Sequence, residues 1–139
     1  MHFRYIGGRF THSVFPWLLQ TDGSYRKHIG RVAAILTHPN GRYTNLVHMQ
    51  SARNSYETEW CSVYNGMLFS LEHNATELTI ENDNLGVVQH LVEFPTKRCP
   101  DYVAHYKHAI RVLANETKHT GIRWIPRKFN RADDLFHKF

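Results

Sequence analysis

The alternation of apolar and polar side chains predicts five strands in this chain. Short apolar runs bounded by turn residues are typical of buried strands, and Gly23 is expected to end the first one with Asp22 at its carboxyl end. The turn residues of 39–41 favour a tight reversal, which makes the second and third strands an antiparallel hairpin. The five predicted strands are Trp17–Asp22, Arg31–His38, Arg42–Gln50, Glu77–Glu81 and Ile122–Ile125.

Apolar residues that recur three and four positions apart predict the helices. The clearest stripe extends from Trp60 to Leu71, and either Asn54 or Ser55 can cap that helix. Shorter stripes occupy residues 85–92, 102–113 and 132–136. Written as βββαβαβα, the order predicts an α/β fold in which helices flank a five-stranded mixed sheet of order 3-2-1-4-5.

Four carboxylates are expected to converge on one edge of this sheet. Asp22 and Asp83 stand at the carboxyl ends of strands that become parallel neighbours, while Glu59 and Asp133 lie in helices that start over that edge. Clustered carboxylates raise one another's pKa or bind a cation, and Mg²⁺ prefers oxygen ligands. Simpler explanations also exist, because Asp83 can be a helix cap and the helix dipole favours an acid at Glu59.

The fourth carboxylate can be either Asp133 or Asp134. Ala132 and Leu135 form an i, i+3 pair that can face the sheet, which directs Asp133 the other way. Choosing Asp134 would place Asp133 where a small apolar residue is expected. We therefore prefer Asp133.

The positive charge is concentrated in the last third of the chain. The formal net charge is +5, yet residues 95–139 alone carry ten Lys or Arg against four acids. A basic region beside an acidic metal pocket suits a polyanion that is held by its phosphates, although a charged solubilising surface would look the same.

Several other classes of site are excluded by composition. Cys61 and Cys99 have no Cys-x-x-Cys neighbour, which argues against a disulfide framework or a zinc site. Eleven histidines include the i, i+3 pair His105 and His108, but no third ligand accompanies that pair. No apolar run is long enough to cross a bilayer.

The length of 139 residues fits one domain, which we place at residues 17–139. Residues 1–16 form an amino-terminal extension whose aromatic and basic side chains suit either stacking on nucleic acid or an added edge strand. The segment lacks the features of a secretory signal. We expect a monomeric cytoplasmic protein without membrane partners.

Four local patterns, in the same order and at compatible spacing, resemble type 1 ribonuclease H. They are Thr21-Asp22-Gly23-Ser24 followed by 30–36, Glu59 with Gly66-Met67, Ile80 to Val88 around Asp83, and Ile125-Pro126-Arg127 with Asn130 and Ala132 to Leu135. The resemblance extends over nearly all of the chain from Trp17 to Phe136.

The resemblance implies an endonuclease that cuts the RNA strand of an RNA/DNA hybrid and leaves a 5′-phosphate. Two Mg²⁺ ions, with Mn²⁺ as a possible substitute, would be held by Asp22, Glu59, Asp83 and Asp133. The residues expected to contact the substrate are Gly23, Ser24, Asn54, Arg127 and Asn130.

The chain departs from the family pattern at three places. Asn54-Ser55-Tyr56 replaces an Asn-rich stretch before the family's Glu, so contacts in the minor groove of the hybrid are expected to differ. Arg127 and Lys128 stand where some members have a loop histidine. No long basic insertion separates the second and third helices, so the hybrid-gripping handle of some members is absent.

Two alternative functions remain open. A DNA-directed nuclease of the same fold would use similar acids, but integrase-like members place their Glu after both aspartates, whereas Glu59 lies between Asp22 and Asp83. A non-catalytic nucleic-acid-binding module is expected to have lost one or more of the acids, and this chain has all four.

Overall fold

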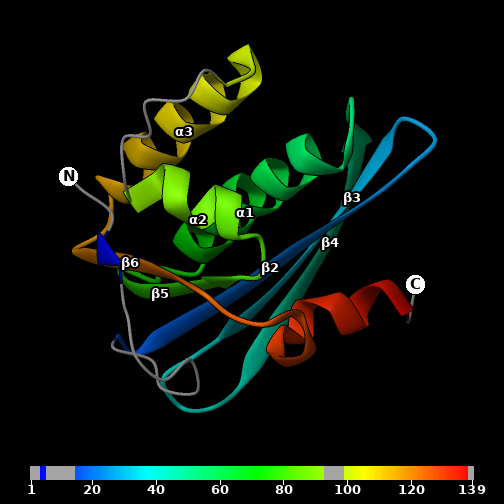
Figure 1. Ribbon diagram of the computed structural model, residues 1–139. Coiled ribbons are helices and arrows are strands. Elements are labelled where there is room, and N and C mark those ends of the chain that lie inside the picture. Colours follow the sequence, from blue (N-terminus) through cyan, green and yellow to red (C-terminus); the bar gives the residue numbers. More distant parts are fainter. Residues whose placement is uncertain (1–3, 6–14, 93–98, 138–139) are drawn as a thin grey trace.

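The computed structural model describes residues 4–5, 15–92 and 99–137. A twisted sheet carries three α-helices over one face and two short 3-10 helices over the other (Figure 1). The strands are β1 (Arg4–Tyr5), β2 (Trp17–Arg26), β3 (Ile29–Thr37), β4 (Tyr43–Ser51), β5 (Glu77–Asn82) and β6 (His119–Trp124). The helices are α1 (Ser55–Glu72), α2 (Leu85–Val92), α3 (Asp101–Ala114), η1 (Arg127–Phe129) and η2 (Arg131–His137).

The strand order confirms the predicted topology. Strands β2 to β6 lie in the order β4-β3-β2-β5-β6, which is 3-2-1-4-5 in the numbering of the five predicted strands. β2 is antiparallel to β3 and parallel to β5, and β5 is parallel to β6. β2 is therefore the strand where the antiparallel half of the sheet meets the parallel half.

The short strand β1 adds a sixth member at the edge of the sheet. Arg4 and Tyr5 pair in parallel with Gly121 and Ile122 of β6. Of the two alternatives for the amino-terminal segment, these two residues adopt the edge strand. Most of the segment lies outside the described residues, so its stacking on nucleic acid stays a prediction.

The predicted end of the first strand is wrong. β2 does not end at Gly23 but continues to Arg26, so Asp22 lies inside the strand and not at its tip. The strand continues because β3 pairs with it from Leu18 to Arg26, with Asp22 opposite Ala33. The parallel pairing with β5 ends at Thr21, and Asp22 is thus the first residue beyond it.

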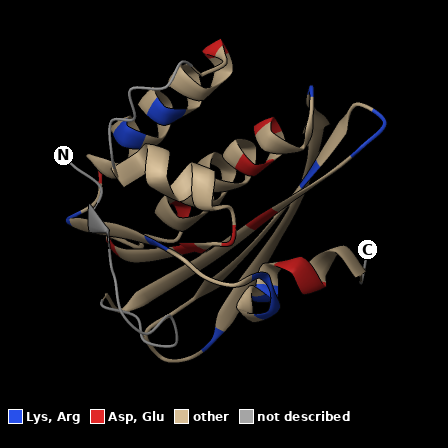
Figure 2. Cartoon of the chain, viewed as in Figure 1, with Lys and Arg blue, Asp and Glu red and all other residues tan. Residues whose placement is uncertain are grey.

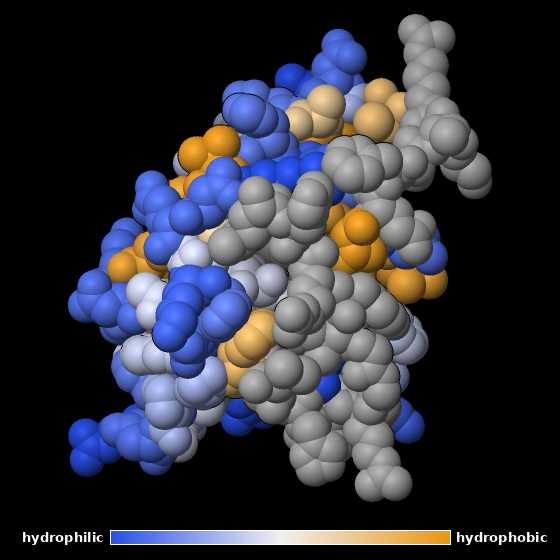
Figure 3. Space-filling view, turned by 90° about the vertical axis from the view of Figure 1, so that its left-hand side faces the viewer, coloured by the Kyte–Doolittle hydropathy of each residue, from blue (hydrophilic) through white to orange (hydrophobic). Residues whose placement is uncertain are grey.

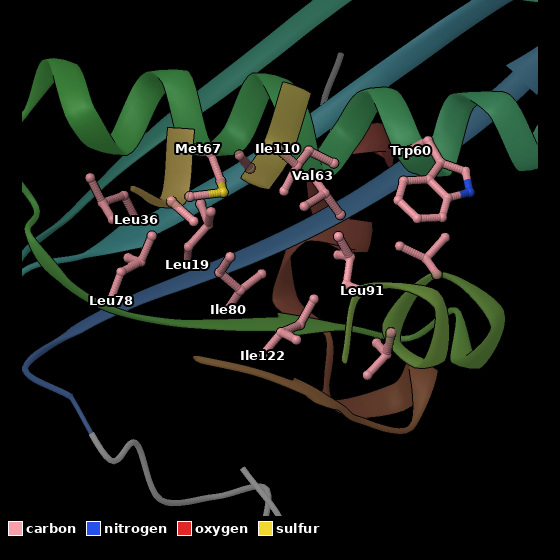
Figure 4. Close-up of a cluster of buried hydrophobic side chains, with 14 of the residues drawn as sticks. Leu19, Leu36, Trp60, Val63, Met67, Leu78, Ile80, Leu91, Ile110 and Ile122 are labelled. Atoms are coloured by element: carbon pink, nitrogen blue, oxygen red, sulfur yellow. The ribbon is translucent and has the colours of Figure 1, made fainter. Parts of the chain in front are cut away.

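The main core lies between the sheet and the helices (Figure 4). Trp60, Val63 and Met67 of the predicted α1 stripe are fully buried against Leu19 of β2 and Ile80 of β5. α3 packs on α1 and contributes Val103 and Ile110 to the same cluster.

Glycine allows α1 to approach β2 closely. A Cβ on Gly66 would lie 2.6 Å from Thr21 Cγ2, and one on Gly23 would lie 2.7 Å from the carbonyl oxygen of Thr58. Such distances are below van der Waals contact, so both positions require the smallest side chain.

The closing segment packs on the opposite face of the sheet. Ala132 and Leu135 of η2 form a small cluster with Ala33 and Ile35 of β3, and Phe136 packs against it. The segment is a 3-10 helix and not the predicted α-helix. It spans seven residues, which is long for this tighter helix.

None of the helices among the described residues is long and apolar enough to span a membrane. Among the described residues visible at the left-hand side of Figure 1, hydrophilic ones predominate, with smaller groups of hydrophobic residues between them (Figure 3).

Candidate metal centre and active-site pocket

A pocket of about 340 Å³ brings the four predicted carboxylates together. Asp22 comes from β2, Glu59 from α1, Asp83 from the junction of β5 and α2, and Asp133 from η2. Asp22, Glu59 and Asp83 each offer a carboxylate oxygen, and these atoms lie within 4.8 Å of one another. Three oxygens at this spacing suit a hard divalent cation.

The peptide nitrogen of Gly23 aligns the first two carboxylates. Its N–H donates to Asp22 Oδ1 at 3.0 Å and to Glu59 Oε1 at 2.8 Å. This shared donor is available because α1 approaches β2 so closely at this glycine. The packing of helix on sheet thus fixes the relative position of two prospective metal ligands.

The beginning of α1 is fixed by its own cap. Asn54 Oδ1 accepts a hydrogen bond from the Glu57 peptide nitrogen at 2.8 Å, and Glu57 Oε1 accepts one from the Arg53 nitrogen at 2.8 Å. Glu57 therefore completes the helix start, which leaves Glu59, two residues further along, to face the pocket.

Two asparagines beside Asp83 form the turn that presents it. Asn82 Oδ1 accepts from the Asn84 nitrogen at 2.7 Å, and Asn84 Oδ1 accepts from the Val87 nitrogen at 3.1 Å. Asn84 therefore caps α2, a role that the sequence also allowed for Asp83. Trp124 Nε1 donates to the Asp83 carbonyl oxygen at 3.0 Å and anchors the turn to β6. The Asp83 carboxylate is left to line the pocket.

Hydrogen bonds to β2 position the segment that carries Asp133. Asn130 Nδ2 donates to the Thr21 carbonyl oxygen at 2.9 Å, and Arg131 Nε donates to Gln20 Oε1 at 2.8 Å. Asp133 lines the pocket, where Arg127 Nη2 lies 3.6 Å and His137 Nε2 3.8 Å from its oxygens. Asp134 is exposed and does not line the pocket.

Crowding and burial favour protonation of the carboxylates. Burial, together with the charges of Glu59 and Asp83, raises the pKa of Asp22 to about 9, and Asp133 contributes in the same direction. Burial and the charge of Asp83 raise the pKa of Glu59 to about 7. Burial also raises the pKa of Asp83, although a hydrogen bond from Asn130 opposes this change. A divalent cation would displace these protons, since metal ligands must be deprotonated.

A comparison with protein families places this geometry in context. The model of the family described as reverse transcriptase-like matches residues 20–138, which is most of the chain. The chain belongs to this family.

Several solved structures share the fold of this reverse transcriptase-like protein. Ribonuclease H1 from the archaeon Halobacterium salinarum superposes with a TM-score of 0.77 at 17% identity, over 86% of this chain and 92% of that one. The amino-terminal ribonuclease H domain of a Mycobacterium tuberculosis protein gives 0.76 at 18%, over 86% and 94%. LC11-RNase H1, solved in complex with an RNA/DNA hybrid, gives 0.74 at 16%, over 86% and 92%.

These likenesses show that the reverse transcriptase-like chain has a type 1 ribonuclease H-like fold. A search of the curated proteins finds no match.

The five residues predicted to contact substrate occupy different environments in this family member. Gly23, Ser24 and Arg127 line the pocket. Asn54 is outside it, with Oδ1 accepting from the Glu57 nitrogen and from the Tyr102 hydroxyl at 3.3 Å. Asn130 is buried, and its two amide atoms bond to the backbone of Thr21 and Ala132.

Sequence reasoning missed part of the pocket wall. Tyr25 and Arg31 of the β2–β3 hairpin and Phe136 and His137 of η2 also line it. Placing β2's end at Gly23 concealed the first pair, since Arg31 lies opposite Ser24 only when the strand continues. His137 stands four residues after Asp133, a spacing that signals a shared face if the segment is read as helical.

Proposed function

We propose that this chain is a metal-dependent endoribonuclease that cuts the RNA strand of RNA/DNA hybrids and leaves a 5′-phosphate. The observation that carries the proposal is the convergence of four carboxylates from four elements in one pocket of a ribonuclease H-like fold. A structural neighbour, LC11-RNase H1, has been solved with such a hybrid. The domain responsible is proposed to span residues 17–139.

Two Mg²⁺ ions, replaceable by Mn²⁺, are the proposed cofactors. Bound ions of this kind activate a water molecule and stabilise the leaving oxygen of a phosphodiester. Asp22, Glu59 and Asp83 would hold the ions through carboxylate oxygens that lie within 4.8 Å of one another. Asp133, which lines the same pocket, would be the fourth ligand. Gly23 holds the Asp22 and Glu59 carboxylates in place through its N–H.

Recognition of RNA is proposed to involve the residues next to Asp22. Ser24 points into the same pocket, and its hydroxyl and the local backbone can contact a ribose 2′-hydroxyl, which is the group that DNA lacks. Arg127 at the rim would bind a phosphate. For Asn54 and Asn130, the observed hydrogen bonds favour an indirect contribution, in which they position Glu59 and Asp133.

We also propose that the protein acts as a monomer in the cytoplasm. The two thiols, Cys61 and Cys99, are free, which suits a reducing compartment. Sedimentation of the purified protein tests the monomer, and fractionation of expressing cells tests the location.

The decisive experiment is cleavage of a hybrid whose RNA strand is end-labelled, with Mg²⁺ and with chelator. Asp83→Asn keeps the shape of the side chain and removes its charge, so cleavage should fall by about a hundredfold or more if this carboxylate holds the metal. Asp134→Asn makes the same chemical change and is the matched control, because Asp134 is exposed and lies outside the pocket.

Matched DNA and RNA duplexes separate the alternative functions. Metal-dependent cutting of the hybrid's RNA alone supports the proposal. Cutting of duplex DNA instead would identify a DNA-directed nuclease of the same fold. Binding of nucleic acid without any cutting would identify a non-catalytic binding module and overturn the proposed activity.

A further inference from the structure

The hairpin that joins β2 to β3 extends beyond the carboxylate pocket and ends in an unusual turn. Lys27 and His28 form the two-residue connection, with φ values of 49° and 66°. This left-handed conformation favours Asn-Gly, and side chains such as those of Lys and His are strained in it. A strained turn that keeps a cationic side chain points to a role for that side chain.

The hairpin tip is basic and exposed. Arg26, Lys27 and His28 are all exposed, and neither Arg26 nor Lys27 takes part in an ion pair found among the described residues. The free end of the hairpin carries the colour of Lys and Arg in the cartoon (Figure 2). From Gly23 to Tyr56 the sequence contains no acid, but five Lys or Arg. Arg26 and Lys27 therefore have no acidic neighbour in the sequence between Gly23 and Tyr56.

The base of the same hairpin forms one wall of the pocket. Tyr25 and Arg31 line the pocket, and the Arg31 guanidinium carbon lies 5.1 Å from the centre of the Phe136 ring. The surface from the pocket to the tip is thus continuous. Lys27 lies five residue steps after Asp22, a distance of about 16 Å along the strand, which is roughly five nucleotides along one strand of a duplex.

A polyanion must approach this pocket past its cluster of acids. Arg127 and Lys128 supply positive charge from η1. The hairpin supplies it from β2 and β3. Cations on both sides of an acidic centre can hold the phosphates on either side of the reacting one.

We propose that the tip formed by Arg26, Lys27 and His28 binds phosphates of the nucleic-acid duplex about five nucleotides from the bond in the pocket. This inference rests on the proposed function for the identity of the duplex. The tip recognises the charge of the backbone and not the base sequence, because phosphates are the same at every nucleotide.

The test is a substitution that improves the turn while it removes the charge. Lys27→Asn combined with His28→Gly supplies the residues that this turn prefers, so the thermal midpoint should stay the same or rise. Binding to an RNA/DNA hybrid, measured by fluorescence anisotropy in chelator, should weaken about three- to tenfold at ~100 mM salt. The slope of log Kd against log salt should fall by about one for each lost phosphate contact.

Arg42→Gln is the matched control. Arg42 follows the β3–β4 turn, at the end of β3 far from Lys27, and removing it changes the net charge by the same amount. Weaker binding in the double variant but not in the control supports the proposal. Equal binding in all three proteins, or equal weakening in both variants, overturns it.

Cleavage assays on the same proteins keep this inference separate from the proposed activity. If the wild type cuts the hybrid and the double variant binds it as tightly as the wild type does, the tip proposal alone fails. If the wild type binds the hybrid through the tip but cuts no substrate, the tip proposal stands and the proposed activity fails.

Discussion

At the scale of single residues, the main feature is a set of acids whose pKa values are raised above the usual range. The raised pKa values of Asp22, Glu59 and Asp83 have burial as their largest cause, and the acids' mutual repulsion adds to it. Each proton therefore binds the folded state more tightly than the unfolded state, where the ordinary pKa applies. Without a cation, the cluster opposes folding when it ionises.

The stability of the metal-free protein should consequently fall as pH rises. The stabilising effect of the bound protons is complete below about pH 4 and is lost on passing through pH 7 for Glu59 and pH 9 for Asp22. Thermal melts in chelator between pH 5 and pH 9 measure this change. Asp22→Asn should flatten the profile and stabilise the protein by about 1–3 kcal/mol at pH 8. A wild-type midpoint that rises over this range would contradict the assignment.

The two adjacent acids of η2 should behave differently. Asp133 lines the pocket beside Arg127 and His137, whereas Asp134 is exposed. Asp133→Asn should reduce metal-dependent cleavage by about tenfold or more, and Asp134→Asn should leave it unchanged within about twofold. Rates measured at saturating Mg²⁺ decide between the two acids. Loss of cleavage in Asp134→Asn but not in Asp133→Asn would show that Asp134 is the metal ligand.

At the scale of elements, the geometry of the pocket depends on how closely α1 lies against β2. Gly66 of α1 lies directly against Thr21 of β2, and Gly23 of β2 lies under the first turns of the same helix. The second contact brings the Gly23 N–H to Glu59. The close packing of α1 on β2 therefore also determines where the Glu59 carboxylate lies.

Gly66→Ala should separate the two elements and destabilise the fold. The added methyl would lie 2.6 Å from Thr21 Cγ2, and overpacking of this kind costs about 1–3 kcal/mol. Thr21→Ser removes that methyl and keeps the hydroxyl that accepts from Asn82 Nδ2 at 3.0 Å. The double variant should therefore recover part of the loss in urea unfolding. Additive losses would show that the clash is relieved elsewhere.

At the scale of the whole molecule, much of the architecture follows from periodicity and chain connectivity. Alternating and helical patterns identified the strands and α-helices, and right-handed crossovers between parallel strands fixed the order of the sheet. The four carboxylates could be assigned to one edge because each stands next to a predicted end of an element. The location of the site could therefore be predicted from the topology of the predicted elements.

The remaining errors have a common physical origin in interactions that single segments do not reveal. The length of β2 depends on pairing with β3 through a turn that lacks the usual Asn-Gly. The cap of α2 could not be assigned among three consecutive polar residues until Asn84 was seen to bond to Val87. The wall formed by Tyr25 and Phe136 requires β2, β3 and η2 to be packed together.

The placement of β2 in the middle of the sheet also orders the events of folding. β2 pairs with β3, which follows it directly in the sequence. Its parallel partner β5 lies some 60 residues further along the chain, as the pairing of Leu19 with Ile80 shows. Such distant contacts form slowly, because a long loop must close before they stabilise anything. The pocket further needs η2, the last described element, to pack on β2 and β3. A growing chain therefore assembles its hairpin early and its acidic centre only after η2 has been made, so a chain that lacks η2 has no complete carboxylate cluster.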